Sequence, residues 1–229
     1  MVLVQKELKN AYIGEKPWWK PWANTLLYYP LTENLADASG HWNTWTMTWT
    51  CSFNSSTGIH VTWKSSNYVT WMSIWVNARN TFTLNVWCKY DSVASWVQTL
   101  WGNSSNTQNY QAMKEELVSW DGLYIWCSVW STNVWGKVGE TSVATTFHNI
   151  CVIANWTTYK FYFNGVLKKQ TTNSGSVNNY WTMNLWYDNY YTSGRAANGY
   201  IKDYIVESVA RTEQEVLDYY NWTKWDYWL

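Results

Sequence analysis

The chain has 229 residues, and its 16 basic and 16 acidic groups give a formal net charge of zero. This length suits one large β domain, or two small ones, with a buried core. The balanced charge argues against a protein that binds nucleic acids or anionic membranes, and the charged residues, 14% of the chain, are too few for a charged disordered tail. No apolar run approaches the roughly 18 residues of a membrane helix, so the sequence predicts no membrane span.

The N-terminal segment, residues 1–22, contains two prolines and has no clear periodicity. This pattern predicts a leader or linker before one domain that covers residues 23–229. The first ten residues also lack the long apolar stretch of a secretory signal peptide.

From residue 24 onward, short apolar or alternating runs are separated by turns rich in Asn, Gly and Ser, such as 102–106 and 172–176. Many short strands with such turns are typical of a β-sandwich or barrel. The predicted strands cover residues 26–29, 69–76, 82–89, 123–130, 147–153, 159–163, 182–187 and 200–206.

One helix is predicted at the C-terminal end of the chain. Thr212, followed three residues later by Glu215, forms a capping box, and an apolar face follows it. Asn221 and Trp222 are the predicted stop signal. We expect this helix to pack on the sheet and to carry no chemistry.

Tryptophan is unusually frequent, with 22 Trp against 11 Gly. Several of these tryptophans occupy positions where the backbone often needs a positive φ, which Gly adopts easily and Trp resists. Trp156 lies between two predicted strands, Trp222 follows the predicted helix, and Trp42 lies in a turn. One interpretation is that such codons are UGA, which some bacterial lineages read as Gly. The alternative is a Trp-rich surface that stacks on sugars.

Four segments, taken in chain order, resemble the laminin-G-like domains of the concanavalin A-like lectin/glucanase superfamily. They cover residues 29–40, 82–87, 147–166 and 198–216. The resemblance implies an all-β fold, an antiparallel two-sheet jelly-roll sandwich with a short C-terminal helix. The family usually has Gly at the positions of Trp42, Trp156 and Trp186, whereas Trp87 stands where the family has Trp.

The chain lacks the evenly spaced carboxylates that glucanases of this fold carry on one strand, so we expect no catalytic activity. Glu115 and Glu116 are adjacent and would point to opposite faces of a strand. Asp203 and Glu207 have even spacing, but they fit the closing strand of the sandwich better. His148 is expected to orient a strand edge or to satisfy a backbone group, and neither it nor the other histidines has a nucleophile motif nearby.

The four cysteines are spaced 37, 39 and 24 residues apart, which matches no zinc motif. Cys88, Cys127 and Cys151 lie in predicted strands, where buried free thiols are common, although one or two disulfides stay open for an extracellular protein. Calcium is the more plausible ion, since Asp and Asn oxygens at a loop rim suit it. Asp37 and Asn43 are the first candidate ligands, and Asp188 with Asn189 the second. Alternatively, Asp37 bonds its own backbone in an Asx-turn.

Sugars offer apolar CH faces and many hydroxyls, which aromatic and Asn or Asp side chains match. The loops at 101–106 and 187–191 combine these residue types. The candidate carbohydrate-binding residues are Trp101, Asn103, Asp188, Tyr190 and Tyr191.

The sequence therefore predicts a non-catalytic module that binds a glycan or a surface protein. A phage or bacterial surface protein would suit it, and its location would be extracellular, cell-surface or virion-associated. A structural or oligomerising domain without a ligand, and a degenerate glycosidase, are the alternatives.

Overall fold

The structure of the chain is a computed structural model that describes residues 24–41, 51–61, 69–74, 81–93, 97–103, 113–129, 132–172, 181–185 and 197–227. In parts of the strands, such as 69–74, 101–103, 127–129 and 181–185, it describes the backbone but not the side chains. The predicted leader, residues 1–22, lies outside the described residues.

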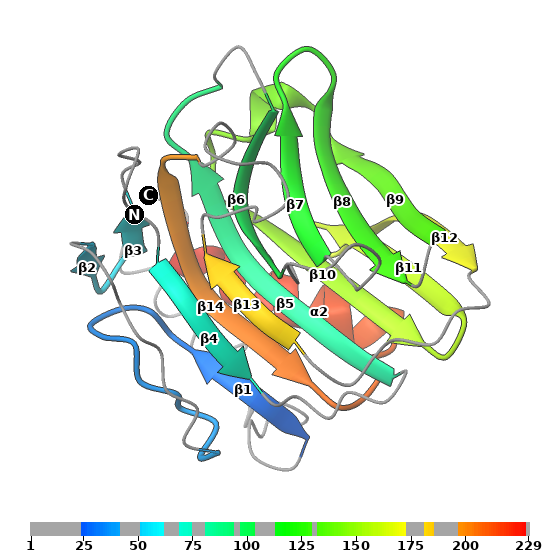
Figure 1. Cartoon of the computed structure of the whole chain (residues 1–229), viewed down its shortest axis with the longest axis horizontal. Coiled ribbons are helices and arrows are strands. Elements are labelled where there is room, and N and C mark those ends of the chain that lie inside the picture. The colour runs from blue at the N-terminus through cyan, green and yellow to red at the C-terminus, as the bar shows by residue number, and fades with distance from the viewer. Residues whose placement is uncertain are drawn as a thin grey trace.

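Two antiparallel sheets form the body of the domain (Figure 1). The larger sheet has the strand order β12-β11-β10-β5-β14-β3-β2, and β1 also pairs with β14. Its strands are β1 (Thr25–Tyr29), β2 (Ser52–Asn54), β3 (Gly58–Val61), β5 (Thr81–Tyr90), β10 (His148–Asn155), β11 (Thr158–Phe163), β12 (Val166–Thr172) and β14 (Gly199–Glu207).

The smaller sheet has six strands in the order β4-β13-β6-β7-β8-β9. They are β4 (Val69–Ile74), β6 (Val97–Asn103), β7 (Met113–Val118), β8 (Gly122–Val129), β9 (Thr132–Gly139) and β13 (Trp181–Leu185). Neighbouring strands β6 to β9 follow one another in sequence, so this part of the sheet is a meander. The two-sheet sandwich predicted from the sequence is confirmed.

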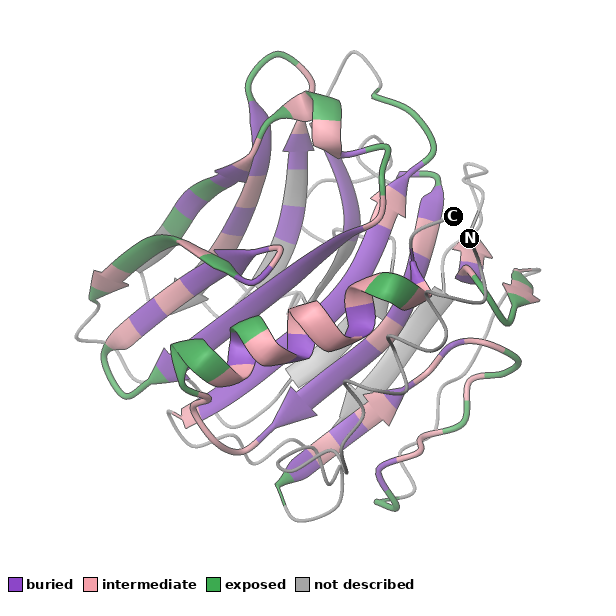
Figure 2. Ribbon diagram, turned by 180° about the vertical axis from the view of Figure 1, so that it is seen from behind, coloured by how far each residue is buried: buried purple, intermediate pink, exposed green. Residues whose placement is uncertain are grey.

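The C-terminal helix α2 (Glu213–Thr223) adds a third layer outside the eight-stranded sheet, as Figure 2 shows from behind. Thr212 caps it, and Glu215 completes the capping box, which confirms the predicted N-terminus. Short 3-10 turns lie at η1 (Thr141–Val143) and η2 (Lys224–Asp226). Among the described residues, no helix is long and apolar enough to cross a membrane.

Strand β5 shows why the eight-stranded sheet needs a cover on each side. Phe82, Leu84 and Val86 point into the main core between the sheets. Trp87 belongs to a second cluster with Tyr219 of α2 and with Tyr227, which follows η2. Alternation along the strand sends these two sets to opposite faces. Because both faces are buried, β5 and β10 are closed to solvent along almost their whole length.

Two predictions about local structure are corrected. Helix α2 continues through Trp222 to Thr223 and then passes into η2, so Asn221 and Trp222 do not stop it. Residues 102 and 103 were expected in a turn, but they end strand β6. The turn at Trp156 is confirmed, since this residue has a φ of 55° between β10 and β11. Trp42 and Trp186 lie outside the described residues.

Candidate binding surface on the six-stranded sheet

Strands β8 and β9 carry a cluster of three aromatic side chains on the outer face of the six-stranded sheet. Tyr124 and Trp126 alternate with Leu123 and Ile125, which are fully buried in the main core. Because successive residues of a strand point to opposite faces, Tyr124 and Trp126 face away from the core. Trp135 of β9 is the register partner of Trp126. We call Tyr124, Trp126 and Trp135 the aromatic platform.

The rings of the platform are in contact with one another. The centroids of Trp126 and Trp135 lie 5.5 Å apart at an interplanar angle of 25°, and those of Tyr124 and Trp135 lie 5.7 Å apart at 50°. Trp135 is nevertheless 50% exposed. Pairs of this kind on neighbouring strands hold each other in place. The platform thus exposes aromatic area to solvent while contacts between the rings keep their orientation fixed.

Charged groups border the platform at the end nearest the β7–β8 turn. The Tyr124 hydroxyl donates a hydrogen bond to the Asp121 carboxylate, and the Lys137 ammonium lies 3.3 Å from Asp121 and 3.0 Å from Glu140. The hydrogen bond from Tyr124 lowers the pKa of Asp121, and the same bond raises the pKa of Tyr124. Donors and acceptors for hydroxyl groups therefore stand next to aromatic faces.

The predicted carbohydrate-binding residues are only partly described. Trp101 and Asn103 lie in strand β6, where they pair with Leu185 and Met183 of β13, rather than in a loop. Strand β7 separates them from β8 and the aromatic platform. The other predicted sugar contacts, Asp188, Tyr190 and Tyr191, lie outside the described residues, so this site stays a prediction.

Asp37, the first predicted calcium ligand, is engaged by hydrogen bonds within the protein. Its Oδ1 accepts from the backbone N–H groups of Tyr28 at 3.0 Å and Ser39 at 2.9 Å, and its Oδ2 accepts from the Ser39 hydroxyl at 2.7 Å. The bond from the residue two positions on is the Asx-turn bond named as the alternative. Asn43 lies outside the described residues, as do Asp188 and Asn189, and calcium binding stays a prediction.

Asp203 and Glu207, the evenly spaced carboxylates considered for catalysis, are both held by neighbours. Asp203 accepts hydrogen bonds from the hydroxyls of Tyr28 and Tyr227, and burial raises its pKa. Glu207 instead pairs with the guanidinium of Arg211, with a nitrogen–oxygen distance of 3.0 Å from Nε. The two carboxylates therefore take part in separate structural contacts.

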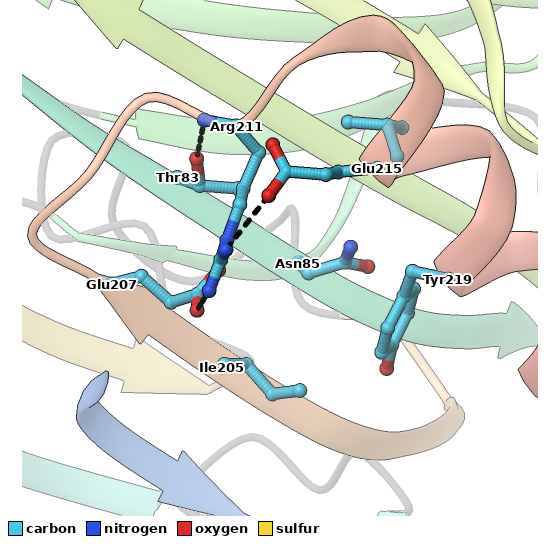
Figure 3. A pocket seen from close by; sticks show the side chains of 8 residues that line it. Thr83, Asn85, Ile205, Glu207, Arg211, Glu215 and Tyr219 are labelled. Atoms are coloured by element: carbon cyan, nitrogen blue, oxygen red, sulfur yellow. Dashed lines mark hydrogen bonds and ion pairs between the residues drawn. The ribbon is translucent and has the colours of Figure 1, made fainter. Parts of the chain in front are cut away.

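Glu207 and Arg211 also line a small cleft between α2 and the eight-stranded sheet (Figure 3). A second ion pair joins Arg211 to Glu215 of the helix at 2.9 Å, and the Arg211 backbone N–H donates to Thr83 at 3.0 Å. The free volume of about 10 Å³ is no larger than one water molecule needs. The residues that line this cleft therefore hold the helix to the sheet, and the cleft itself is too small for a sugar.

Sequence reasoning missed the aromatic platform and placed the aromatic site elsewhere. The signal was present as Tyr124 and Trp126 at two-residue spacing, within a strand that was predicted correctly. What the sequence did not show was the partner strand, since β9 was not predicted and Trp135 could not be assigned to the same face. Only the pairing of β8 with β9 brings the three rings together.

A family model described as the concanavalin A-like lectin/glucanases superfamily matches residues 63–217. No curated protein matches the chain. Among solved structures, domain 4 of the GH43 extracellular arabinanase AbnA from Geobacillus stearothermophilus, in complex with arabinotriose, is similar with a TM-score of 0.65 and 18% identity over 85% of this chain and 97% of that one.

The receptor-binding domain of botulinum neurotoxin D is also similar, with a TM-score of 0.70 and 13% identity over 86% of this chain. The chain spans about half of that domain, 52% of its length. The binding domain of botulinum neurotoxin DC, in complex with rat synaptotagmin II, has a TM-score of 0.64 at 12% identity, over 86% of this chain and 51% of that one. At these identities the likeness shows the fold.

Proposed function

The chain belongs to the concanavalin A-like lectin/glucanases superfamily, and from this premise we propose that it is a non-catalytic carbohydrate-binding module. The aromatic platform on β8 and β9 is the observation that carries the proposal. Trp135 offers a half-exposed indole face beside two further rings, and the CH faces of a sugar ring stack on such surfaces. The arabinanase domain that was solved with arabinotriose has the same fold, which supports this class of ligand.

The charged groups beside the platform provide the second feature that sugar binding requires, which is hydrogen bonding. Sugar hydroxyls need donors and acceptors, and Asp121, Lys137 and Glu140 supply both at the edge of the rings. The Tyr124 hydroxyl is already bonded to Asp121, so its ring is fixed before a ligand arrives. A ring held in this way loses little rotational freedom on binding.

The backbone at the platform is compatible with genuine tryptophan. Trp126 and Trp135 lie within paired strands, where aromatic residues are favoured, and neither is among the described residues with positive φ. Trp156 is the described tryptophan that has this backbone conformation. We therefore expect UGG codons at positions 126 and 135, and a UGA codon at either position would count against the platform.

The test is glycan binding by the full chain and by two tryptophan variants of similar exposure. We expect binding to one or more plant or bacterial polysaccharides, arabinan included, on a glycan array and in isothermal titration. Trp135→Ala should weaken this binding about tenfold or more, which is about 1.4 kcal/mol. Trp156→Ala is the matched control, because Trp156 is 66% exposed but lies in the β10–β11 turn, and it should bind like the unchanged chain.

Three results would contradict the proposal. They are absence of glycan binding by the unchanged chain, equal losses in the two variants, and release of reducing sugar from a bound polysaccharide. A loss in Tyr190→Ala with normal binding by Trp135→Ala would move the site to the loop predicted from the sequence. A surface protein is the second class of partner, and an extracellular, cell-surface or virion-associated location belongs to the same proposal.

A further inference from the structure

Three side chains with metal-ligating atoms meet in the interior of the sandwich. Cys88 of β5 and His148 of β10 are direct register partners in the eight-stranded sheet, and Glu115 reaches them from β7 of the six-stranded sheet. The Cys88 Sγ lies 3.0 Å from Glu115 Oε2 and 3.4 Å from His148 Nε2, and that Nε2 lies 2.8 Å from Glu115 Oε1. All three side chains have no exposed surface.

The surroundings of the cluster are largely apolar and aromatic. The His148 ring stacks on Phe163 with a centroid separation of 5.5 Å, and the Tyr90 ring lies parallel to it at 6.5 Å. A carboxylate in such surroundings is unfavourable unless a proton neutralises it or a positive charge compensates it. The nature of that proton or cation decides what the cluster does.

The hydrogen bond of the other imidazole nitrogen restricts the possibilities. His148 Nδ1 lies 2.9 Å from the carbonyl oxygen of Thr146. Because a carbonyl only accepts, Nδ1 carries the hydrogen and Nε2 turns toward the Glu115 carboxylate. An Nε2 lone pair cannot face a carboxylate lone pair at 2.8 Å, so a proton or a metal ion lies between the two atoms. The proton would belong either to the ring or to the Glu115 carboxyl.

We propose that Cys88, Glu115 and His148 bind one Zn²⁺ ion, which joins the two sheets through the core. A thiolate, an imidazole and a carboxylate are ligands that zinc accepts together, whereas calcium and magnesium prefer oxygen ligands only. The bond from Nδ1 to the Thr146 carbonyl is the outer contact that usually orients a histidine bound to zinc. Three protein ligands leave one position of the tetrahedron for water or another group.

The distances and charges agree with this assignment. In a tetrahedral zinc site the ligand atoms are about 3.3–3.6 Å apart, given zinc bonds of about 2.0–2.3 Å. Here one ligand atom from each of the three side chains lies within 4.8 Å of the other two, and the Sγ–Nε2 distance of 3.4 Å is already in this range. Zinc replaces the thiol proton and the proton that lies between Nε2 and the Glu115 carboxyl, and both protons leave to solvent. The cluster is neutral before and after this exchange.

The burial of the cluster makes the site structural. Because all three side chains are closed to solvent, the ion would enter as the two sheets assemble, so zinc binding would be coupled to folding. The spacing of 27 residues from Cys88 to Glu115 and 33 from Glu115 to His148 hides the site from the short zinc motifs that a sequence can show.

The test uses the full chain, unfolded in the presence of a chelator and refolded with Co²⁺ in place of Zn²⁺. We expect one equivalent of Co²⁺ per chain and the near-ultraviolet charge-transfer absorption of a cobalt–thiolate bond. Cys88→Ser should lose this absorption. Cys151→Ser is the matched control, because Cys151 is also a fully buried free thiol, in β10, but packs in the cluster beneath α2, and it should keep the absorption.

Absence of bound metal in the refolded, unchanged chain would overturn the proposal and leave a buried His148–Glu115 hydrogen bond. Persistence of the thiolate absorption in Cys88→Ser would overturn it as well. If Cys88→Ser does not fold, zinc X-ray absorption on the unchanged chain replaces it. One sulfur among nitrogen and oxygen ligands would support the site, and a shell without sulfur would refute it.

Discussion

The two outer faces of the sandwich carry similar aromatic residues, but these residues are buried on one face and partly exposed on the other. On the eight-stranded sheet, Trp87 packs beneath α2 and η2, 4.2 Å from the ring of Tyr227 between centroids, and is 1% exposed. On the six-stranded sheet, Trp135 stacks on Trp126 and stays half exposed. The first face is covered by the chain's own C-terminal segment, and the second is not covered at β9.

This difference in exposure indicates which aromatic cluster stabilises the fold and which is available to bind a ligand. An aromatic cluster that the chain covers itself contributes to the free energy of folding, because its area leaves water when the protein folds. A cluster of similar composition that is left exposed contributes less, and its remaining area is available to a ligand. Exposure of a ring that its neighbours hold in place is therefore a better guide to a binding surface than tryptophan content.

The strongest test of this contrast is Trp87→Ala on the covered face. We expect a loss of about 3–5 kcal/mol in the free energy of unfolding, the usual cost of removing a buried aromatic side chain. The variant also leaves the Thr223 hydroxyl without the indole N–H, which donates to it at 3.1 Å. Guanidinium unfolding followed by circular dichroism measures the change.

Trp135→Ala is the matched variant on the open face, and it should cost less than about 1 kcal/mol because half of its side chain is already in water. Equal losses in Trp87→Ala and Trp135→Ala would show that both clusters are core and would remove the basis for the binding surface.

The sequence predicted the covered face better than the open one. Alternation in 82–89 identified β5, and the Thr212–Glu215 capping box identified the start of α2, because both signals are local. The aromatic platform depends on the pairing of β8 with β9, and β9 was not predicted as a strand. The Cys88–Glu115–His148 cluster depends on contacts between the two sheets, and contacts between distant segments leave no periodic trace in the sequence.

The two faces also differ in how they shift the pKa of an aspartate. On the covered face burial is the largest influence on Asp203, and it raises the pKa. On the open face the hydrogen bond from Tyr124 lowers the pKa of Asp121. A carboxyl whose pKa is raised in the folded state stabilises the fold at low pH, and this stabilisation is lost as the pH rises. A carboxyl whose pKa is lowered stabilises the fold at neutral pH, and this stabilisation is lost on acidification.

We therefore expect Asp203→Asn and Asp121→Asn to show opposite pH dependence. Relative to the unchanged chain, Asp203→Asn should become progressively more stable as the pH rises from about 3 to 7, since the unfolded carboxyl titrates near 3.9. Asp121→Asn should become less stable relative to the unchanged chain as the pH rises through the acid range below about 5, because the lowered pKa of Asp121 lies beneath the unfolded value near 3.9, and the change should be smaller because its charge is exposed. Thermal unfolding at a series of pH values measures both, and slopes of the same sign would refute the contrast.

The smallest expected effect concerns Trp156, which is exposed for a different reason from Trp135. Its φ of 55° costs a non-glycine residue about 1–2 kcal/mol, whereas Gly adopts it freely and loses about 0.4–1 kcal/mol through its more flexible unfolded state. Trp156→Gly should therefore stabilise the chain by about 0.5–1 kcal/mol in guanidinium unfolding. Trp156→Ala, which keeps the strained backbone, should not.

Stabilisation by Gly alone would mean that the exposure of Trp156 follows from its turn and not from a binding role. It would also support the interpretation of this codon as a UGA that the source organism reads as Gly, which the gene sequence can test directly. A loss of stability in Trp156→Gly would instead show that the indole packs usefully on the hairpin. In that case Trp156 would no longer serve as an inert control for Trp135, and another exposed tryptophan, such as Trp225 at 51%, would have to replace it.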